Sequence, residues 1–371
     1  MKSILVGNGI NIHLGGKEYC NAEIIKRLLS NLNIKDYSYI FNHKIDEHNL
    51  VNLMYGLYRE FKNIFKGKYD SFCNTNDERF TLNRIKKQYT PRTSMFDIGM
   101  EDYFFILKIY HNSFQDSSDL IKGTYDGLCW LLLDAIYNNG NIQKIHEYVS
   151  SSKRNKIRNI FGEFENIFTV NYDCNVEMIS EKQVYYLHGD FNTLLDQYNP
   201  DTLIGRMYLE QGEINPSLRG DKHIYCNGIM GFTGSFKYDV ITKFKNANLG
   251  IEKILEMVTV GLTKEDEEKI EQMKNSSDKK IKFAYNLIQT KLKYPNLSIH
   301  QYPSNIFESI IDELTIVGLS PNNDEHIWDI IRKNRNLKKI IYYYKGLESK
   351  KIIDDLYSDL NIITLPIEQF W

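Results

Sequence analysis

The chain opens with Met1-Lys-Ser-Ile-Leu-Val-Gly-Asn-Gly-Ile-Asn-Ile-His-Leu-Gly-Gly16, an apolar run followed by a glycine-rich turn. The apolar run, Ser3 to Val6, is long enough for one buried strand and too short for a helix. It ends at Gly7-Asn8-Gly9, where the glycines permit a tight turn and the close approach of a ligand to the backbone. Glu18 to Leu29 then has the apolar spacing of a helix. A strand, a glycine turn and a helix form a parallel-sheet unit whose turn can offer free N–H groups to a phosphate.

The glycine spacing alone leaves two interpretations open. A dinucleotide-binding fingerprint has a third glycine three residues after the second, and this chain has Ile12 at that place. Gly15 and Gly16 come too late for that pattern. The turn could therefore hold a nucleotide, or it could join a strand to a helix without any ligand. The rest of the chain has to decide between the two.

Length and composition limit the class of protein. With 371 residues, the chain is long enough for one large domain or two smaller ones. Hydrophobic residues make up 42% of it, which is enough for a core and excludes wholesale disorder. Its 46 Lys and Arg nearly balance 48 Asp and Glu, so no global charge attracts it to nucleic acid or to a membrane. High Tyr and Phe contents (26 and 19) and only 7 prolines favour a helix-rich body packed with aromatic side chains.

The cysteines indicate a reducing compartment. The sequence has five scattered cysteines: Cys20, Cys73, Cys129, Cys174 and Cys226. No two of them have a C-x-x-C spacing, so neither a zinc ribbon nor a disulfide framework is predicted. The N-terminus has no apolar core of signal-peptide length, and no apolar run is long enough to span a membrane. We therefore expect a cytoplasmic protein that does not associate with membranes.

Alternating strands and helices predict the fold class. After the first unit, apolar runs of strand length occur at 166–170, 183–187, 314–319, 340–344 and 362–365. The glycine-rich stretch 228–236 is predicted as a strand with loops. We expect an α/β fold, a Rossmann-like parallel sheet with a large helical insertion between its first and second strands. The expected domains are an α/β domain at 1–34 and 160–371, a helical insertion at 35–159 and a smaller helical insertion at 237–300.

Four of the predicted strands are followed by polar segments with small residues. The segments are Gly7-Asn8-Gly9-Ile10-Asn11, Asn171-Tyr172-Asp173, His188-Gly189-Asp190 and Gly318-Leu319-Ser320, the last leading to Asp324. In parallel α/β sheets the carboxyl ends of the strands share one edge, where ligands bind. We therefore expect all four segments to face one crevice, which makes their residues candidates for a functional site.

The order of these segments resembles a known superfamily. A glycine-x-glycine turn, F-T-V-N-Y-D at 168–173, L-H-G-D at 187–190 and I-V-G-L-S at 316–320 with a following Asp are similar to the sirtuin-like superfamily. Within it, the chain resembles the bacterial sirtuin-like NAD-cleaving domains of antiphage defence. The opening G-N-G-I-N-I-H-L-G also resembles the abortive-infection H (AbiH) family, in which an Asp usually stands at the place of Asn11. Sirtuins have Ala at the place of Asn8 and Ser at that of Asn11, so this chain departs from them there.

The resemblance implies that NAD is the substrate and that the nicotinamide–ribose bond is broken, through an oxocarbenium-like transition state. It implies that Asn171 hydrogen-bonds ribose or water and that His188 is the general base, because imidazole titrates near neutral pH. Asp173 or Asp190 would orient His188 or stabilise the developing cation. NAD would be held at its pyrophosphate by Gly7, Asn8, Gly9 and Asn11, and on its adenosine side by Gly318, Ser320 and Asp324.

The resemblance also bears on cofactors and partners. Protein-deacylating sirtuins carry a four-cysteine zinc module, and no pairing of the cysteines here supplies one. Hydrolysis of NAD without zinc is therefore expected rather than acyl transfer, with depletion of cellular NAD in antiphage (abortive infection) defence as its purpose. Family members of this kind often act as homo-oligomers or with a separate HerA-like translocase-type ATPase.

Structural alternatives exist for these candidates. Asn171 and Asp173 could cap a helix predicted at Cys174 to Ile179, and Ser320 and Asp324 could cap one that begins at Asp324. A lone histidine is more often structural than catalytic, and His13 is expected to be structural.

A different class of function also remains open. The chain could be a nucleotide sensor or a nucleic-acid-binding module without turnover, as the basic clusters at 153–158 and 332–339 suggest. Such clusters are usually solvated helix faces, and the net charge of -2 argues against binding driven by phosphates. A nuclease is a further alternative, although no carboxylate cluster has metal-ligand spacing.

Overall fold

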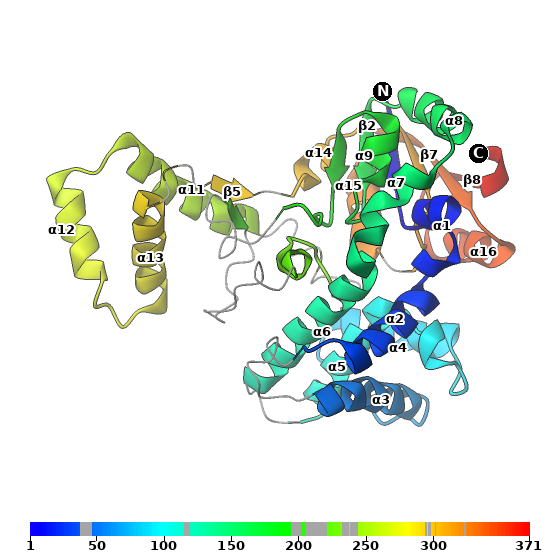
Figure 1. The fold of residues 1–371 in the computed structure, drawn as a ribbon, viewed down its shortest axis with the longest axis horizontal. Coiled ribbons are helices and arrows are strands. Elements are labelled where there is room, and N and C mark those ends of the chain that lie inside the picture. Colours follow the sequence, from blue (N-terminus) through cyan, green and yellow to red (C-terminus); the bar gives the residue numbers. More distant parts are fainter. Residues whose placement is uncertain are drawn as a thin grey trace.

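The computed structural model of the chain describes residues 1–37, 47–114, 119–193, 202–204, 221–231, 237, 244–293, 295, 298–300, 302–322 and 324–371. Their centre is a six-stranded parallel sheet with the strand order β3-β2-β1-β6-β7-β8 (Figure 1). The strands span Lys2–Val6 (β1), Asn166–Thr169 (β2), Val184–Tyr186 (β3), Asp312–Val317 (β6), Leu337–Tyr344 (β7) and Ile362–Pro366 (β8). The predicted Rossmann-like α/β class is therefore confirmed.

The strand order reverses at β1, which pairs with β2 on one side and with β6 on the other. Leu5 of β1 lies opposite Phe168 on one side and opposite Ile316 on the other. The chain proceeds outward from β1 to β3 and then crosses back to β6. The pair β1 and β6 is thus the topological switch point. Open α/β sheets bind their ligands in the crevice outside the carboxyl ends of the strands at such a point.

Both faces of β1 are buried, because successive side chains of a strand point to opposite faces. Ile4 and Val6 pack on one face, together with side chains of α8 (Ser151–Gly162) and α9 (Asn175–Ser180). Leu5 packs on the other face with side chains of α15 (Glu325–Lys333). This burial explains the uninterrupted apolar run, since a parallel sheet needs cover on both faces.

The described chain between β1 and β2 is mostly helical, which confirms the predicted insertion. Its helices before α8 are α1 (Gly9–Gly15), α2 (Asn21–Ile34), α3 (Glu47–Ile64), α4 (Asn76–Gln88), α5 (Met100–Asn112), α6 (Asp119–Tyr137) and α7 (Ile145–Tyr148). Short 3-10 helices occur at Lys17–Tyr19, Met95–Asp97 and Asn138–Lys144. Helices α2 to α6 lie below the sheet in Figure 1 around an apolar core that includes Phe61, Phe104 and Leu132.

The first helix begins earlier than predicted. α1 starts at Gly9, directly after the turn, and α2 starts only at Asn21, so the predicted helical start at Glu18 is wrong. Gly16 separates the two helices with a φ of 101°, a conformation that interrupts a helix and favours glycine.

The remaining elements follow β3. Strands β4 (Thr202–Ile204) and β5 (Ser298–His300) pair in parallel in a separate two-stranded sheet. Helices α11 (Phe244–Val260), α12 (Lys264–Met273) and α13 (Lys279–Lys293) stand apart from the main sheet at the left of Figure 1. Two further helices, α14 (Ser304–Glu308) and α16 (Leu347–Leu356), and 3-10 helices at Lys222–Tyr225 and Ile367–Gln369 complete the described chain. Among the described helices, none has both the length and the apolar character of a membrane span.

The stretch 228–236 is not a strand in its described part. Residues 228–231 are irregular, and residues 232–236 lie outside the described residues. The N–H of Ile229 donates to the His188 carbonyl at 2.9 Å, and the Ile229 carbonyl accepts from the Tyr172 hydroxyl at 2.7 Å. Because these bonds tie the backbone to the loops after β2 and β3, the stretch forms no ladder there.

Candidate active site

A cavity of about 810 Å³ lies at the carboxyl edge of the sheet, within the size range of small-molecule sites. All four predicted segments contribute to its wall, through Asn8, Gly9, Asn11, Asn171, Asp173, His188, Gly318, Ser320 and Asp324. Gly7 is not part of the wall, but its carbonyl accepts a hydrogen bond from Asn171. The expectation of one shared crevice is therefore confirmed, and the roles of the residues in it stay predictions.

The turn after β1 packs directly against the turn after β6. The Gly7 N–H donates to the Val317 carbonyl at 2.9 Å, and the Gly9 N–H donates to the Gly318 carbonyl at 2.8 Å. A Cβ atom on Gly7 would lie 2.5 Å from the Gly318 oxygen, and one on Gly9 would lie 2.6 Å from the Gly318 Cα. Glycine is required at both positions because two backbones meet here. These two N–H groups are committed to the carbonyls of Val317 and Gly318, so a phosphate at this turn would depend on groups of Asn8 and Asn11.

We expect Gly7→Ala to destabilise the fold by about 1–3 kcal/mol, the usual cost of overpacking. The added methyl group can be accommodated only if the backbone after β6 moves away. The measurement is the free energy of unfolding in denaturant. Gly56→Ala in α3 is the matched control, because no atom lies within 4 Å of its added Cβ. A Gly7→Ala variant as stable as the parent would contradict the close packing of the two turns.

A buried hydrogen-bond network joins α1 to the loop after β2. Asn11 Nδ2 donates to Asp173 Oδ2 at 2.5 Å, and Asn175 Nδ2 donates to Asp173 Oδ1 at 2.6 Å. Burial raises the pKa of Asp173, while the bonds from Asn11 and Asn175 oppose that rise. The Asp173 carboxylate also accepts from the Asn175 N–H, so it supports the start of α9. Its predicted place as the N-cap is wrong by one residue, because α9 begins at Asn175 with Cys174 at the N-cap.

Asn171 is held at the cavity wall by its own strand end. Its Nδ2 donates to the Gly7 carbonyl at 3.3 Å, and its backbone N–H donates to Thr169 Oγ1 at 3.0 Å. Neither bond involves α9, so Asn171 does not cap that helix. Asn8, on the neighbouring segment, donates from Nδ2 to the Tyr19 carbonyl at 2.9 Å. Two neutral amide side chains therefore lie fixed beside the cavity at the ends of β1 and β2.

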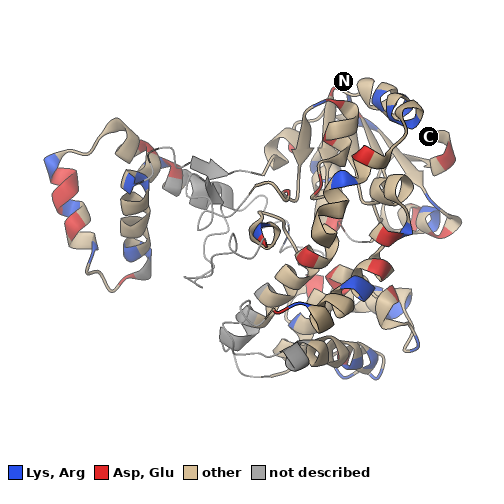
Figure 2. Cartoon of the chain, in the orientation of Figure 1, with Lys and Arg blue, Asp and Glu red and all other residues tan. Residues whose placement is uncertain are grey.

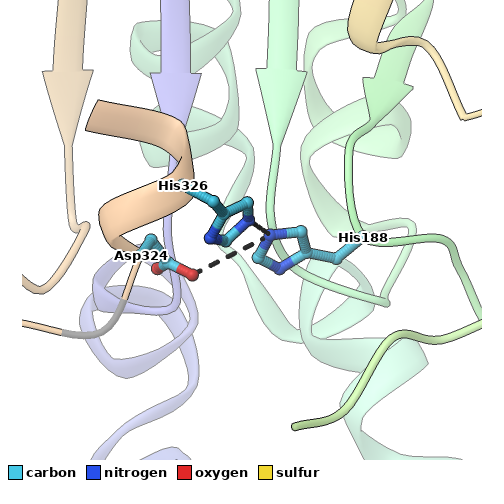
Figure 3. A group of neighbouring side chains, drawn as sticks. All are labelled: His188, Asp324 and His326. Atoms are coloured by element: carbon cyan, nitrogen blue, oxygen red, sulfur yellow. Dashed lines mark hydrogen bonds and ion pairs between the residues drawn. The ribbon is translucent and has the colours of Figure 1, made fainter. Parts of the chain in front are cut away.

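His188 follows β3 and meets Asp324 and His326 at the start of α15 (Figure 3). The Nε2 atoms of His188 and His326 are 2.8 Å apart, and Asp324 Oδ1 is 3.8 Å from His188 Nε2. Burial lowers the pKa of both histidines well below its ordinary value, and the Lys237 ammonium lowers it further. His188 is therefore neutral at pH 7 and can accept a proton, as a general base must.

Lys237 is a buried ammonium between two carboxylates. Its Nζ lies 2.9 Å from Glu101 Oε1 and 3.5 Å from Asp324 Oδ1, and its side chain is 2% exposed. Burial raises the pKa of both carboxyl groups, and Lys237 opposes that rise. Burial lowers the pKa of Lys237, but the two carboxylates outweigh it and raise the pKa above the ordinary value. Because Glu101 belongs to α5, this ion cluster joins the helical insertion to the sheet beside the cavity.

Removing the charge of Lys237 is expected to be costly. Lys237→Met would leave the buried Asp324 and the partly buried Glu101 carboxyl groups without their partner, which typically costs about 3–5 kcal/mol of the free energy of unfolding. Denaturant unfolding of the variant and the parent measures the difference. Lys269→Met is the matched control, since its ion pair with Glu265 is solvent-exposed and such pairs contribute about 1 kcal/mol at most. Equal losses in both variants would show that the buried cluster stabilises the fold no more than an exposed ion pair does.

His188, Asp324 and His326 also offer the donor atoms of a metal site, all within 4.8 Å of one another. Two features count against that interpretation. The 2.8 Å between the two Nε2 atoms is shorter than the roughly 3.3 Å that two nitrogens on one tetrahedral zinc require. The Lys237 ammonium beside Asp324 would also repel a divalent cation. We therefore interpret the two histidines as a hydrogen-bonded pair with the Asp324 carboxylate beside it.

Ser320 and Asp324 behave differently from each other. Ser320 is exposed at the rim, and its Oγ accepts from the Asn322 N–H at 3.4 Å. Asp324 occupies the N-cap position of α15, but its side chain makes no capping hydrogen bond and pairs with Lys237 instead. The capping alternative therefore does not explain either side chain.

Two further residues near the site have structural partners. Asp190 accepts from the N–H and the hydroxyl of Thr193, so it stabilises its own turn. Among the described contacts, none joins Asp190 to His188, which removes Asp190 as the group that orients His188. His13 lines the cavity and stacks on Trp371, with ring centroids 4.3 Å apart.

Sequence patterns do not identify His326, Lys237 or Glu101 as neighbours of His188. For His326 a signal existed, because it lies two residues after Asp324 at the start of a helix that follows a predicted strand. Glu101 and Lys237 are 136 residues apart in the chain and come together only through the fold. No local pattern could have found that pair.

Comparisons with known proteins add no assignment. The chain matches no protein-family model, no curated protein and no solved structure. Its fold class follows from the strand order and register, and its function has to follow from the contacts in the cavity.

Proposed function

We propose that this chain is a sirtuin-like NAD hydrolase that cleaves the nicotinamide–ribose bond. The observation that carries the proposal is the convergence of four strand-end segments on one cavity, with a neutral buried histidine in its wall. The cavity lies outside the carboxyl ends of β1 and β6, where the strand order reverses, and this position suits a nucleotide. The resemblance of the same segments to NAD-cleaving sirtuin-like domains supports NAD as that nucleotide.

The chemistry of the bond fits a site with neutral polar groups. Positive charge develops on the ribose as nicotinamide leaves with the electron pair of the carbon–nitrogen bond. A water oxygen then bonds to the ribose carbon, and His188 accepts the proton that the water loses. The products are nicotinamide, ADP-ribose and one proton. Asn171 hydrogen-bonds the ribose or the water without adding a charge of its own.

In this proposal the carboxylates of Asp173 and Asp324 act indirectly. Asp173 fixes Asn11 and the loop after β2, and its negative charge favours the developing cation. Asp324 lies beside His188 and stabilises the imidazolium that forms when His188 accepts a proton. Gly318 and Ser320, at the end of β6, take the adenosine side of NAD.

The proposal is tested by incubating the pure protein with NAD and separating the products. Nicotinamide and ADP-ribose are expected in equal amounts that increase with time. NAD that binds but stays intact would favour the alternative of a nucleotide sensor. DNA and RNA in parallel incubations test the nuclease alternative, for which intact nucleic acid is the expected result.

The basic cluster of α8 gives the nucleic-acid alternative little support. Figure 2 shows Lys and Arg along this helix, but most of them have partners within the chain. Lys153 Nζ donates to the His13 carbonyl, Arg154 donates to the His146 carbonyl, and the Arg158 guanidinium pairs with Glu181.

In the second basic cluster, at 332–339, three side chains pair with carboxylates. Arg332 pairs with Asp359, Lys338 with Asp312 and Lys339 with Glu313. Because these side chains already have acidic partners, a phosphate backbone would have to compete with them. The first cluster is better explained by bonds to carbonyls and an ion pair within the chain, and the second by surface ion pairs, than by a nucleic-acid interface.

The biological setting is proposed on the resemblance alone. An NAD hydrolase of this kind would deplete cellular NAD in antiphage defence, as a homo-oligomer or with a HerA-like translocase-type ATPase. The mass of the pure protein in solution, alone and with such an ATPase, distinguishes these arrangements.

A further inference from the structure

His188 and His326 face each other through like atoms. Their Nε2 atoms are 2.8 Å apart, and their ring planes are inclined by 25°. Two neutral imidazoles at this distance form a hydrogen bond only if one nitrogen carries a hydrogen and the other offers a lone pair. Figure 3 shows the second nitrogen of His188, Nδ1, pointing away from His326 and toward the side on which the strands end.

We propose that His326 is a positioning residue that accepts a hydrogen bond from His188 Nε2–H and thereby keeps the lone pair of His188 on Nδ1. The inference rests on the proposed function, in which His188 takes a proton from the attacking water. His326 is not part of the cavity wall, so it acts through His188 and not on the substrate.

The charges around the pair favour this tautomer. Asp324 Oδ1 lies 3.8 Å from His188 Nε2, so a hydrogen on that nitrogen faces a negative oxygen as well as the lone pair of His326. In the opposite tautomer, the lone pair of His188 Nε2 would lie beside the same carboxylate. The pairing of Asp324 with Lys237, which in turn pairs with Glu101, fixes the carboxylate in this place.

The second nitrogen of His326 leaves the choice of tautomer to the charges around the pair. His326 Nδ1 is buried and has no hydrogen-bond partner among the described residues. In the proposed tautomer this nitrogen carries a hydrogen, and in the opposite tautomer it offers a lone pair, so it is unpaired in both.

The tautomer decides whether His188 can act as a base. With the hydrogen on Nε2, Nδ1 takes the proton of the water as the water oxygen bonds to the ribose carbon. The ring becomes an imidazolium that donates Nε2–H to His326 and faces Asp324. With the hydrogen on Nδ1 instead, His188 could only donate toward the cavity, and the water would keep its proton.

Two substitutions of similar size separate positioning from packing. His326→Gln places an amide oxygen near the position of Nε2 and keeps a hydrogen-bond acceptor, whereas His326→Met offers only a weakly accepting sulfur. We expect His326→Met to lower kcat about 10–100-fold, part of the usual contribution of a positioned base. His326→Gln is expected to stay within about five-fold of the parent, with KM nearly unchanged in both. Equal losses in two folded variants would overturn the positioning role.

A second measurement needs no turnover. The ¹⁵N spectrum of the parental protein labelled at histidine reports which ring nitrogen carries hydrogen, with His188→Ala and His326→Met to assign the signals. Hydrogen on Nε2 of His188 and on Nδ1 of His326 is expected, and hydrogen on Nδ1 of His188 would overturn the proposal even if NAD is cleaved. Absence of nicotinamide release in the parent, with the expected tautomers present, would instead count against the proposed function and with it the catalytic use of the pair.

Discussion

Asn171→Ala is expected to abolish nicotinamide release from NAD while the fold stays intact. Among the described residues the side chain makes one hydrogen bond, from Nδ2 to the Gly7 carbonyl at 3.3 Å, and a bond of that kind is worth about 0.5–1.5 kcal/mol. Its larger contribution is to the reaction, where it holds the ribose or the water at the end of β2. Release of nicotinamide and the midpoint of thermal unfolding are measured on the same preparation.

Asn33→Ala is the matched control for this substitution. Asn33 is exposed on α2, and its Nδ2 also donates to a backbone carbonyl, that of Leu29 at 2.8 Å. The control loses an equivalent hydrogen bond far from the cavity wall, so its rate should equal that of the parent. A folded Asn171→Ala variant that releases nicotinamide at the parental rate would show that Asn171 only links the ends of β1 and β2.

His188→Ala should reduce turnover about 10²–10⁴-fold, the usual contribution of a positioned general base. NAD binding should weaken much less, because the pyrophosphate is expected at the turn after β1 and not at His188. Turnover and the NAD dissociation constant are therefore measured on one variant. His111→Ala, which changes a histidine of α5 outside the cavity wall, serves as the control and should keep both values.

The pH dependence of the parent follows from the surroundings of His188. Burial, and then the positive charge of Lys237, lower the pKa of His188 well below its ordinary value. The neutral, active form therefore persists as the pH falls through 6.5, the ordinary histidine value, and activity declines only at lower pH. A decline centred near pH 6.5 or above would show that another group titrates. Loss of NAD binding together with turnover in His188→Ala would make His188 a ligand-holding residue.

The strands could be predicted because burial on both faces requires an uninterrupted run of apolar residues. Ile4, Leu5 and Val6 are all buried, so the run has no polar interruption, and the turn glycines mark its end. The same holds for Ile316 and Val317 of β6. Since the ends of parallel strands meet at one edge, the strand assignments were enough to bring the candidate segments together.

The helix α1 was not predictable in the same way. Its seven residues include glycine at both ends and one asparagine, all poor helix formers. It is stabilised by its surroundings, since Ile10 packs against β1 and Asn11 bonds to Asp173. Tertiary contacts of this kind override local propensity and leave no periodic pattern in a stretch so short.

The electrostatic state of the candidate site could not be predicted from the sequence either. A neighbouring Asp190 would have raised the pKa of His188, and burial would have lowered it, so the sequence left the direction open. In the fold, Asp190 stabilises its own turn. Lys237 and His326 come from distant segments of the chain and lie near His188. Burial lowers the pKa of His188 most, and Lys237 and His326 lower it further, so the direction of the shift depends on the folded surroundings.

A structure of the Asn171→Ala variant with NAD bound would measure the distance from His188 Nδ1 to the nicotinamide ribose. This variant retains His188 and should leave the ligand intact. We expect the ribose or a water beside it within about 3.2 Å of Nδ1, the reach of a general base, with the pyrophosphate at the turn after β1. NAD bound outside the cavity, or with its nicotinamide ribose remote from His188, would contradict the proposed hydrolysis at this site.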